Sequence, residues 1–193
     1  MKAMRVAVVA FALITTAASA VSAQYESSDR SPIGLRVAVF RPTDSVLKNL
    51  SKNWLGPVID YNARFDKKDR PEIKATFGWF GEDKGIDKAS YLPVTATYIK
   101  RYYKENSDRC WFAGGGAGIY LVSYRHVVPT GPFSNSLVKD RGTEFGLNVV
   151  GGYETGPWFL ELRYDLTSGL GIADGGSVDF SGLTVSLGTN IAF

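Results

Sequence analysis

Residues 180–193, Phe-Ser-Gly-Leu-Thr-Val-Ser-Leu-Gly-Thr-Asn-Ile-Ala-Phe, alternate large apolar residues with small or polar ones at the end of the chain. A β-strand turns successive side chains to opposite faces, so this stretch predicts a strand with one apolar and one polar face. The predicted apolar face consists of Leu183, Val185, Leu187, Ile191 and Phe193. We expect this strand to end the chain on an aromatic residue, with no polar tail to fray.

The first 23 residues have the three parts of a secretory signal peptide. Residues 1–5 are basic and residues 6–14 are apolar, and Ala20 and Ala23 each follow the small residues that a signal peptidase requires. The apolar run is shorter than the roughly 20 residues that span a bilayer. We therefore expect export of the chain, with cleavage after Ala23 preferred over cleavage after Ala20.

Composition excludes several classes of exported protein. Loss of residues 1–23 removes Lys2 and Arg5 and no acid, so 22 basic residues become 20 against 19 acidic ones. A net charge of +1 gives no basic excess for a nucleic-acid partner. The single cysteine, Cys110, forms no intramolecular disulfide and lies too far from the cleavage site to carry a lipid anchor. We expect no metal or other cofactor, because the sequence has no metal-ligand cluster and no phosphate-binding motif.

Seven further segments have strand character, with apolar and polar residues on alternating positions. These seven segments are residues 33–41, 54–65, 72–81, 91–103, 110–123, 143–153 and 157–166. With the terminal strand, the chain has eight predicted strands. Segment 110–123 is the hardest to orient, because both of its faces carry large apolar residues.

The connections between these segments alternate in length. The gaps 66–71, 104–109 and 154–156 are short, whereas the gaps 42–53, 82–90, 124–142 and 167–178 are longer. An even number of strands with this alternation is typical of a membrane β-barrel that has short periplasmic turns and longer external loops. We therefore predict an all-β fold, an eight-stranded antiparallel up-and-down transmembrane β-barrel.

A membrane barrel turns its apolar face outward, so the charged face of each strand is expected to line the lumen. The predicted lumen charge network, which is either structural or pore-lining, consists of Arg36, Asp60, Arg64, Lys74, Arg101, Glu144, Glu161, Arg163 and Asp165. We favour a structural network that fills the lumen, since eight strands enclose an interior narrow enough for side chains to fill. The predicted aromatic residues of the two membrane interfaces are Trp54, Trp79, Tyr98, Trp111, Tyr153, Trp158 and Tyr164.

The segment 158–166, Trp-Phe-Leu-Glu-Leu-Arg-Tyr-Asp-Leu, followed by a Gly-rich loop and the strand that ends at Phe193, resembles the last hairpin of small OmpA-like and OmpW-like outer-membrane barrels. In such families Phe193 would serve as an assembly signal that the barrel assembly machinery reads. The resemblance implies a bacterial outer-membrane location. The domain order is then a signal peptide at 1–23, a short periplasmic segment at 24–32 and a barrel at 33–193.

The fold alone does not define an activity. We favour a structural, adhesive or surface-interaction role through external loops, as a monomer in contact with outer-membrane lipid, lipopolysaccharide and an unknown surface ligand. The alternative is a narrow channel for small or apolar solutes, as in OmpW-like barrels. A soluble lipocalin-like carrier is a less favoured fold.

A lipid A-modifying enzyme is also less favoured, and we expect no enzymatic activity. His126 is the sole histidine and falls in the longest predicted loop, where we expect it to be exposed. The lipid A deacylase family carries a His-x-Ser-Asn arrangement, but Pro132 stands two residues before Ser134 here. Residues 43–50 begin with capping residues and have apolar residues at helical spacing, so a short helix over the barrel mouth is expected.

Overall fold

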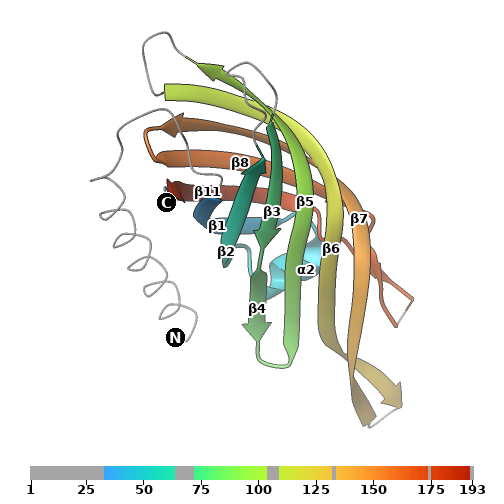
Figure 1. The fold of residues 1–193 in the computed structure, drawn as a ribbon. Helices are drawn as coiled ribbons and strands as arrows, with labels where there is room; N and C mark the ends of the chain where they lie inside the picture. Colours follow the sequence, from blue (N-terminus) through green and yellow to red (C-terminus); the bar gives the residue numbers. More distant parts are fainter. Residues whose placement is uncertain (1–32, 64–71, 104–108, 132–133, 174, 192–193) are drawn as a thin grey trace.

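The computed structural model describes residues 33–63, 72–103, 109–131, 134–173 and 175–191, which form a β-barrel with one short helix (Figure 1). The signal peptide and the 24–32 segment lie outside the described residues. The elements in chain order are β1 (Ile33–Pro42), α2 (Ser45–Leu50), β2 (Trp54–Ala63), β3 (Glu72–Gly78), β4 (Phe80–Lys84), β5 (Asp87–Tyr103), β6 (Arg109–Gly131), β7 (Ser134–Thr155), β8 (Trp158–Thr167), β9 (Leu170–Gly171), β10 (Ser177–Val178) and β11 (Gly182–Ile191).

The sheet closes on itself, which confirms the predicted eight-stranded antiparallel barrel. Each strand pairs with its neighbour in the chain, and β3 and β4 act as one strand because both pair with β5. The barrel is closed by β11, which pairs with β1 from Ile33↔Ile191 to Pro42↔Gly182. A closed barrel requires this pairing of the last strand with the first, whereas Phe193 itself lies outside the described residues.

The two faces of the barrel are the reverse of those in a soluble protein. On β11 the apolar residues Leu183, Val185 and Leu187 point outward and are 39%, 40% and 52% exposed. Thr184 and Ser186 between them are buried in the lumen. An apolar exterior around a polar interior is what a bilayer requires of a sheet that spans it.

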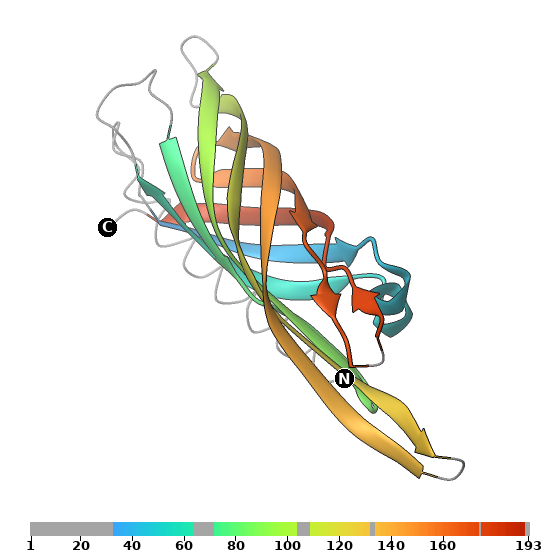
Figure 2. The same cartoon turned by 90° about the vertical axis from the view of Figure 1, so that its right-hand side faces the viewer.

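Two connections that were predicted as loops are instead continuations of strands. Residues 82–90 contain the tight β4–β5 hairpin, and residues 124–142 form the outer part of the β6–β7 hairpin. Figure 2 shows this hairpin projecting beyond the rest of the barrel. The physical reason is local, since β-branched residues such as Val127, Val128 and Val138 favour an extended backbone over a loop. We call the residues 124–142 the β6–β7 extension.

The predicted short helix is present and lies against the barrel as α2. The Asp44 carboxylate caps it by accepting hydrogen bonds from the backbone N–H of Val46 at 2.7 Å and of Leu47 at 3.3 Å. Leu47 is buried, which anchors the helix over the lumen. In the part of the chain that the structure describes, no helix has the length and apolar character needed to cross a membrane.

The glycines of β6 allow close approach of the neighbouring backbone. A Cβ at Gly116 would lie 2.1 Å from the carbonyl oxygen of Ala96, and one at Gly114 would lie 2.1 Å from that of Tyr98. A Cβ at Gly115, between them, would approach no atom more closely than 3.5 Å. Gly114 and Gly116 therefore make room for the backbone of β5.

We expect Gly116→Ala to lower the free energy of unfolding by about 1–3 kcal/mol, because the added methyl group must displace the β5 backbone. Gly115→Ala is the matched control and should change stability by less than about 0.5 kcal/mol. Urea titration of the barrel in lipid vesicles measures both changes. Equal effects of the two substitutions would contradict the close-approach explanation.

Candidate functional site

The lumen is the candidate site, because the polar side chains converge there. Arg36 of β1 lies at its centre and is 2% exposed. Its guanidinium donates to Asp60 at 2.6 Å and to the Ser186 hydroxyl at 3.1 Å, and it also pairs with Glu161. Hydrogen bonds between ionised partners are stronger than those between neutral groups. One arginine therefore links its own strand to β2, β8 and β11 across the interior.

Lys74 of β3 completes this cluster by pairing with Glu161. Asp60 accepts a further hydrogen bond from the Thr76 hydroxyl at 2.7 Å. Both carboxylates are thus held between cations or hydroxyl groups, as burial of a charge requires. The geometry is that of an ion-pair network in which both carboxylates have partners, whereas the buried Arg36 Nε has no hydrogen-bond partner among the described residues.

A second cluster lies around Arg101 of β5. Its guanidinium donates to Glu72 at 2.9 Å and pairs with Glu154. Glu154 also accepts from the Asn190 amide at 3.3 Å. Glu72 and Glu154 were absent from the predicted network. Each lies an even number of residues from a predicted member on the same strand, Lys74 and Glu144 respectively. The alternation of side chains along a strand therefore predicts that both point into the lumen.

A third group joins the charged part of the lumen to an aromatic part. Arg163 donates to Asp165 through Nε at 2.8 Å and through a terminal nitrogen at 2.7 Å. The Tyr120 hydroxyl donates to the same carboxylate at 2.8 Å. Glu144 is buried but stands apart from these clusters and accepts from the Ser168 hydroxyl. Arg64 lies outside the described residues.

The space left among the charged side chains is small. The cavity bounded by Asp60, Lys74, Arg101 and Glu161 has a volume of about 10 Å³. That is room for about one water molecule. The charged clusters of the described residues therefore fill this half of the lumen, and the cavity is too small for a continuous file of water.

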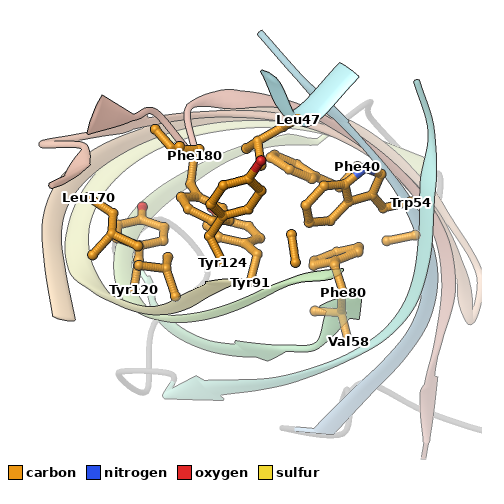
Figure 3. Close-up of a cluster of buried hydrophobic side chains, with 14 residues drawn as sticks. Phe40, Leu47, Trp54, Val58, Phe80, Tyr91, Tyr120, Tyr124, Leu170 and Phe180 are labelled. Atoms are coloured by element: carbon orange, nitrogen blue, oxygen red, sulfur yellow. The ribbon is translucent and has the colours of Figure 1, made fainter. Parts of the chain in front are cut away.

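The other half of the lumen is filled by aromatic residues, which were not predicted from the sequence (Figure 3). Tyr91 is central, with its ring 4.6 Å from that of Phe40, 5.6 Å from that of Tyr120 and 6.0 Å from that of Phe180. All four side chains are fully buried. We call the buried group around Tyr91 the aromatic plug, and its members are Phe40, Trp54, Phe80, Tyr91, Tyr120 and Phe180.

The prediction that Trp54 lies at a membrane interface is wrong. Trp54 is 0% exposed, packs edge-on against Phe40 at 5.7 Å and donates its indole N–H to the Ser51 carbonyl oxygen at 2.9 Å. Trp54 and Asp60 are separated by an even number of residues on β2, so their side chains point to the same face of the strand. The alternation that placed Asp60 in the lumen therefore places Trp54 there too. Alternation along the strand predicts the face of a side chain better than its proximity to the end of the strand does.

The other predicted interface aromatics point outward. Trp79, Tyr98 and Trp111 are 58%, 56% and 64% exposed. Tyr153 packs against Trp111 with ring centroids 4.8 Å apart. On β8, Trp158 and Tyr164 share the outward face with Leu160 and Leu162. On β6, Trp111 points outward and Phe112 inward, which orients the segment that the sequence left open.

His126 does not lie in an exposed loop, so that expectation is wrong. It belongs to β6, is 8% exposed and stacks on Tyr124 with ring centroids 4.9 Å apart. Its Nδ1 lies 3.6 Å from an Asp140 carboxylate oxygen. Within the described ranges, no group of three or more His, Cys, Asp or Glu side chains is arranged to hold a metal ion.

Comparisons with known proteins show the fold of this chain but do not assign it to a family. No family model matches the chain, and no curated protein matches it in sequence. The crystal structure of Neisserial surface protein A matches with a TM-score of 0.59 and 15% identity, over 86% of this chain and 100% of that one. The chain has the fold of the small outer-membrane β-barrels.

A second solved structure supports the same fold. Ail, the attachment invasion locus protein of Yersinia pestis, matches with a TM-score of 0.50 and 17% identity, over 86% of this chain and 100% of that one. The outer-membrane enzyme PagL is a more distant match, with a TM-score of 0.47 and 13% identity over 83% of this chain and 99% of that one. At 15% and 17% identity, the likeness to Neisserial surface protein A and to Ail shows the barrel architecture and carries no activity to this chain.

Proposed function

We propose that this protein is a sealed integral outer-membrane barrel that holds the β6–β7 extension at the cell surface in a structural or adhesive role. The exposed apolar residues on the outer face of the barrel support the membrane location, and the fold shared with outer-membrane barrels agrees with it. The signal peptide of residues 1–23 would supply the export route, and the barrel assembly machinery would insert the chain.

The observation that carries the proposal is the filling of the lumen. The charged clusters leave about 10 Å³ among them, and the aromatic plug occupies the other half. A solute would have to displace both the charged clusters and the aromatic plug to cross the barrel. This favours a closed, OmpA-like barrel over an OmpW-like channel, and we propose no enzymatic activity and a monomeric barrel.

The β6–β7 extension is the element best suited to an interaction role. Its strands are paired from Tyr124↔Asp140 to Pro129↔Asn135 and, after a shift in register, at Gly131↔Ser134, so a paired two-stranded ladder supports the extension. Function in barrels concentrates at such external segments, which a rigid scaffold positions. Leu137 near its tip is 56% exposed.

Cysteine labelling on intact cells tests this topology. We expect Ser136→Cys, in a Cys110→Ala background, to react with a membrane-impermeant maleimide on intact cells. Thr155→Cys, at the opposite end of β7, is the matched control and should react after permeabilisation of the outer membrane. Equal labelling of both positions on intact cells, or labelling of Thr155→Cys alone, would contradict the proposed orientation.

A further inference from the structure

β7 has a paired strand along the whole of one edge but along only part of the other. Its pairing with β6 covers all of β7. On the other edge, its pairing with β8 ends with the hydrogen bond that the Ser168 N–H donates to the Phe145 carbonyl oxygen at 3.0 Å. Gly169 follows with a φ of 84°, which no extended strand has, so β8 does not continue along β7.

The part of β7 that precedes Phe145 therefore has an open edge. Residues of an antiparallel strand direct their backbone N–H and C=O groups alternately to one neighbour and to the other. Because Phe145 directs its carbonyl oxygen to β8, every second residue before it directs its backbone groups to the same edge. No strand of the described residues pairs with them there. These residues are Leu137, Lys139, Arg141 and Thr143, which we call the β7 edge.

The β7 edge is accessible to another polypeptide. It lies on the hairpin that projects beyond the rest of the barrel (Figure 2), and all four of its side chains are exposed. Its four residues extend about 20 Å along the strand, which is the length of an ordinary strand pairing. An exposed edge with unpaired N–H and C=O groups is the surface to which an extended peptide adds as a further strand.

The side chains of the β7 edge select the partner. Lys139 and Arg141 are two residues apart and both exposed, and neither forms an ion pair with a carboxylate of the described residues. On paired strands, opposite charges that face each other attract and like charges repel. A strand that fits this edge therefore has acidic residues opposite Lys139 and Arg141 and an apolar residue opposite Leu137.

A second copy of this chain fits the β7 edge poorly. Antiparallel pairing of two copies through this edge, centred on Asp140, would set Lys139 of each copy against Arg141 of the other. Like charges directly opposite each other are destabilising. The two cations thus oppose self-association at an open edge, as charged residues on edge strands commonly do. An acidic strand of another protein meets no such repulsion.

We propose that the β7 edge binds an extended, acidic segment of another protein by strand addition. The segment would pair antiparallel with β7, as β8 does further along the same edge. Backbone hydrogen bonds would hold the segment, and its two carboxylates would set the register against Lys139 and Arg141. This inference deepens the proposed function by giving the class of partner, and it rests on the display of the β6–β7 extension at the cell surface.

Binding of a synthetic peptide to the full-length barrel in lipid nanodiscs tests the proposal. The probe is fluorescently labelled Thr-Val-Glu-Thr-Glu-Val-Val, and fluorescence anisotropy measures its dissociation constant. Methylation of the backbone nitrogens of both Glu residues, whose N–H groups would face β7, should weaken binding at least about tenfold. Methylation of the residue before each Glu, whose N–H would face away from β7, is the matched control and should change binding less than about twofold.

Two substitutions at one position of the barrel separate backbone pairing from charge. Lys139→Pro removes the edge N–H, whereas the residues on either side keep their backbone bonds to β6. It should weaken binding at least about tenfold more than Lys139→Gln, which removes only the charge. Lys52→Gln removes an exposed cation outside the β7 edge and should leave binding unchanged. The heat-dependent shift in gel mobility shows for each variant that the barrel is folded.

Equal weakening by the two Lys139 substitutions, or equal effects of methylation at the two sets of peptide positions, would overturn pairing through the backbone. Equal affinity for a peptide with Lys in place of both Glu residues would overturn the acidic partner. Peptide binding to the purified barrel reports on the β7 edge itself, and labelling of Ser136→Cys on intact cells reports on its display. The two proposals can therefore fail independently.

Discussion

Arg36→Met is expected to lower the free energy of unfolding by about 3–5 kcal/mol, because it leaves buried carboxylates without their shared cation. Arg36 pairs with both Asp60 and Glu161, and all three side chains are at most 2% exposed. After the substitution, Lys74 is left as the one cation in this cluster of described residues and pairs with Glu161. Denaturant titration in lipid vesicles, followed by tryptophan fluorescence, measures the loss.

Arg41→Met is the control for this prediction, since Arg41 belongs to the same strand but is exposed. It should change stability by less than about 0.5 kcal/mol. Adding Asp60→Asn to Arg36→Met removes one of the stranded charges and should recover part of the loss. If Arg36→Met were no more harmful than Arg41→Met, the lumen charges would not form a coupled network.

The second large effect is expected at the centre of the aromatic plug. Tyr91→Ala should cost about 3–5 kcal/mol, because it removes a fully buried ring and leaves a cavity between Phe40, Tyr120 and Phe180. The same titration in vesicles measures the change. Tyr91→Phe keeps the ring and should stay within about 1 kcal/mol of the unsubstituted chain.

The comparison of these two variants separates packing from hydrogen bonding. A large loss in Tyr91→Ala with little loss in Tyr91→Phe shows that ring stacking stabilises this half of the lumen. Equal losses would show that the hydroxyl group is what matters, and the aromatic plug would then be incidental to stability.

The barrel itself could be predicted from sequence because its determinants are local and periodic. Alternation along residues 182–191 assigns Leu183 to the lipid face and Ser186 to the lumen, and the structure agrees. The closing pair of β1 and β11 follows because an open edge in hydrocarbon leaves backbone groups unpaired. These rules need no knowledge of distant contacts.

The filling of the lumen was harder to predict, because it depends on which strands face one another across the barrel. Lumen charges are conspicuous in sequence, so Arg36, Glu161 and Arg163 were found. The aromatic residues of the lumen were not, since an aromatic side chain such as Tyr91 suits the lipid interface equally well when its strand is considered alone. Register across β5 and β6 is what turns Tyr91 and Tyr120 to the same side.

The ends of the strands were also misjudged. Residues 82–90 and 124–142 were predicted as connections between strand segments, but paired strands continue into both. The β-branched residues Val127, Val128 and Val138 favour the extended backbone that the structure has there. This error hid the β6–β7 extension and the buried position of His126.

Flux through reconstituted vesicles tests most directly whether this is a sealed barrel. The full-length protein is inserted into phospholipid vesicles loaded with a self-quenching anionic dye and, separately, with small neutral sugars, and an open porin serves as the positive control. We predict no release of either solute above that of empty vesicles, because charged clusters and the aromatic plug fill the lumen. Selective, saturable release of one solute would contradict a sealed lumen and establish a channel.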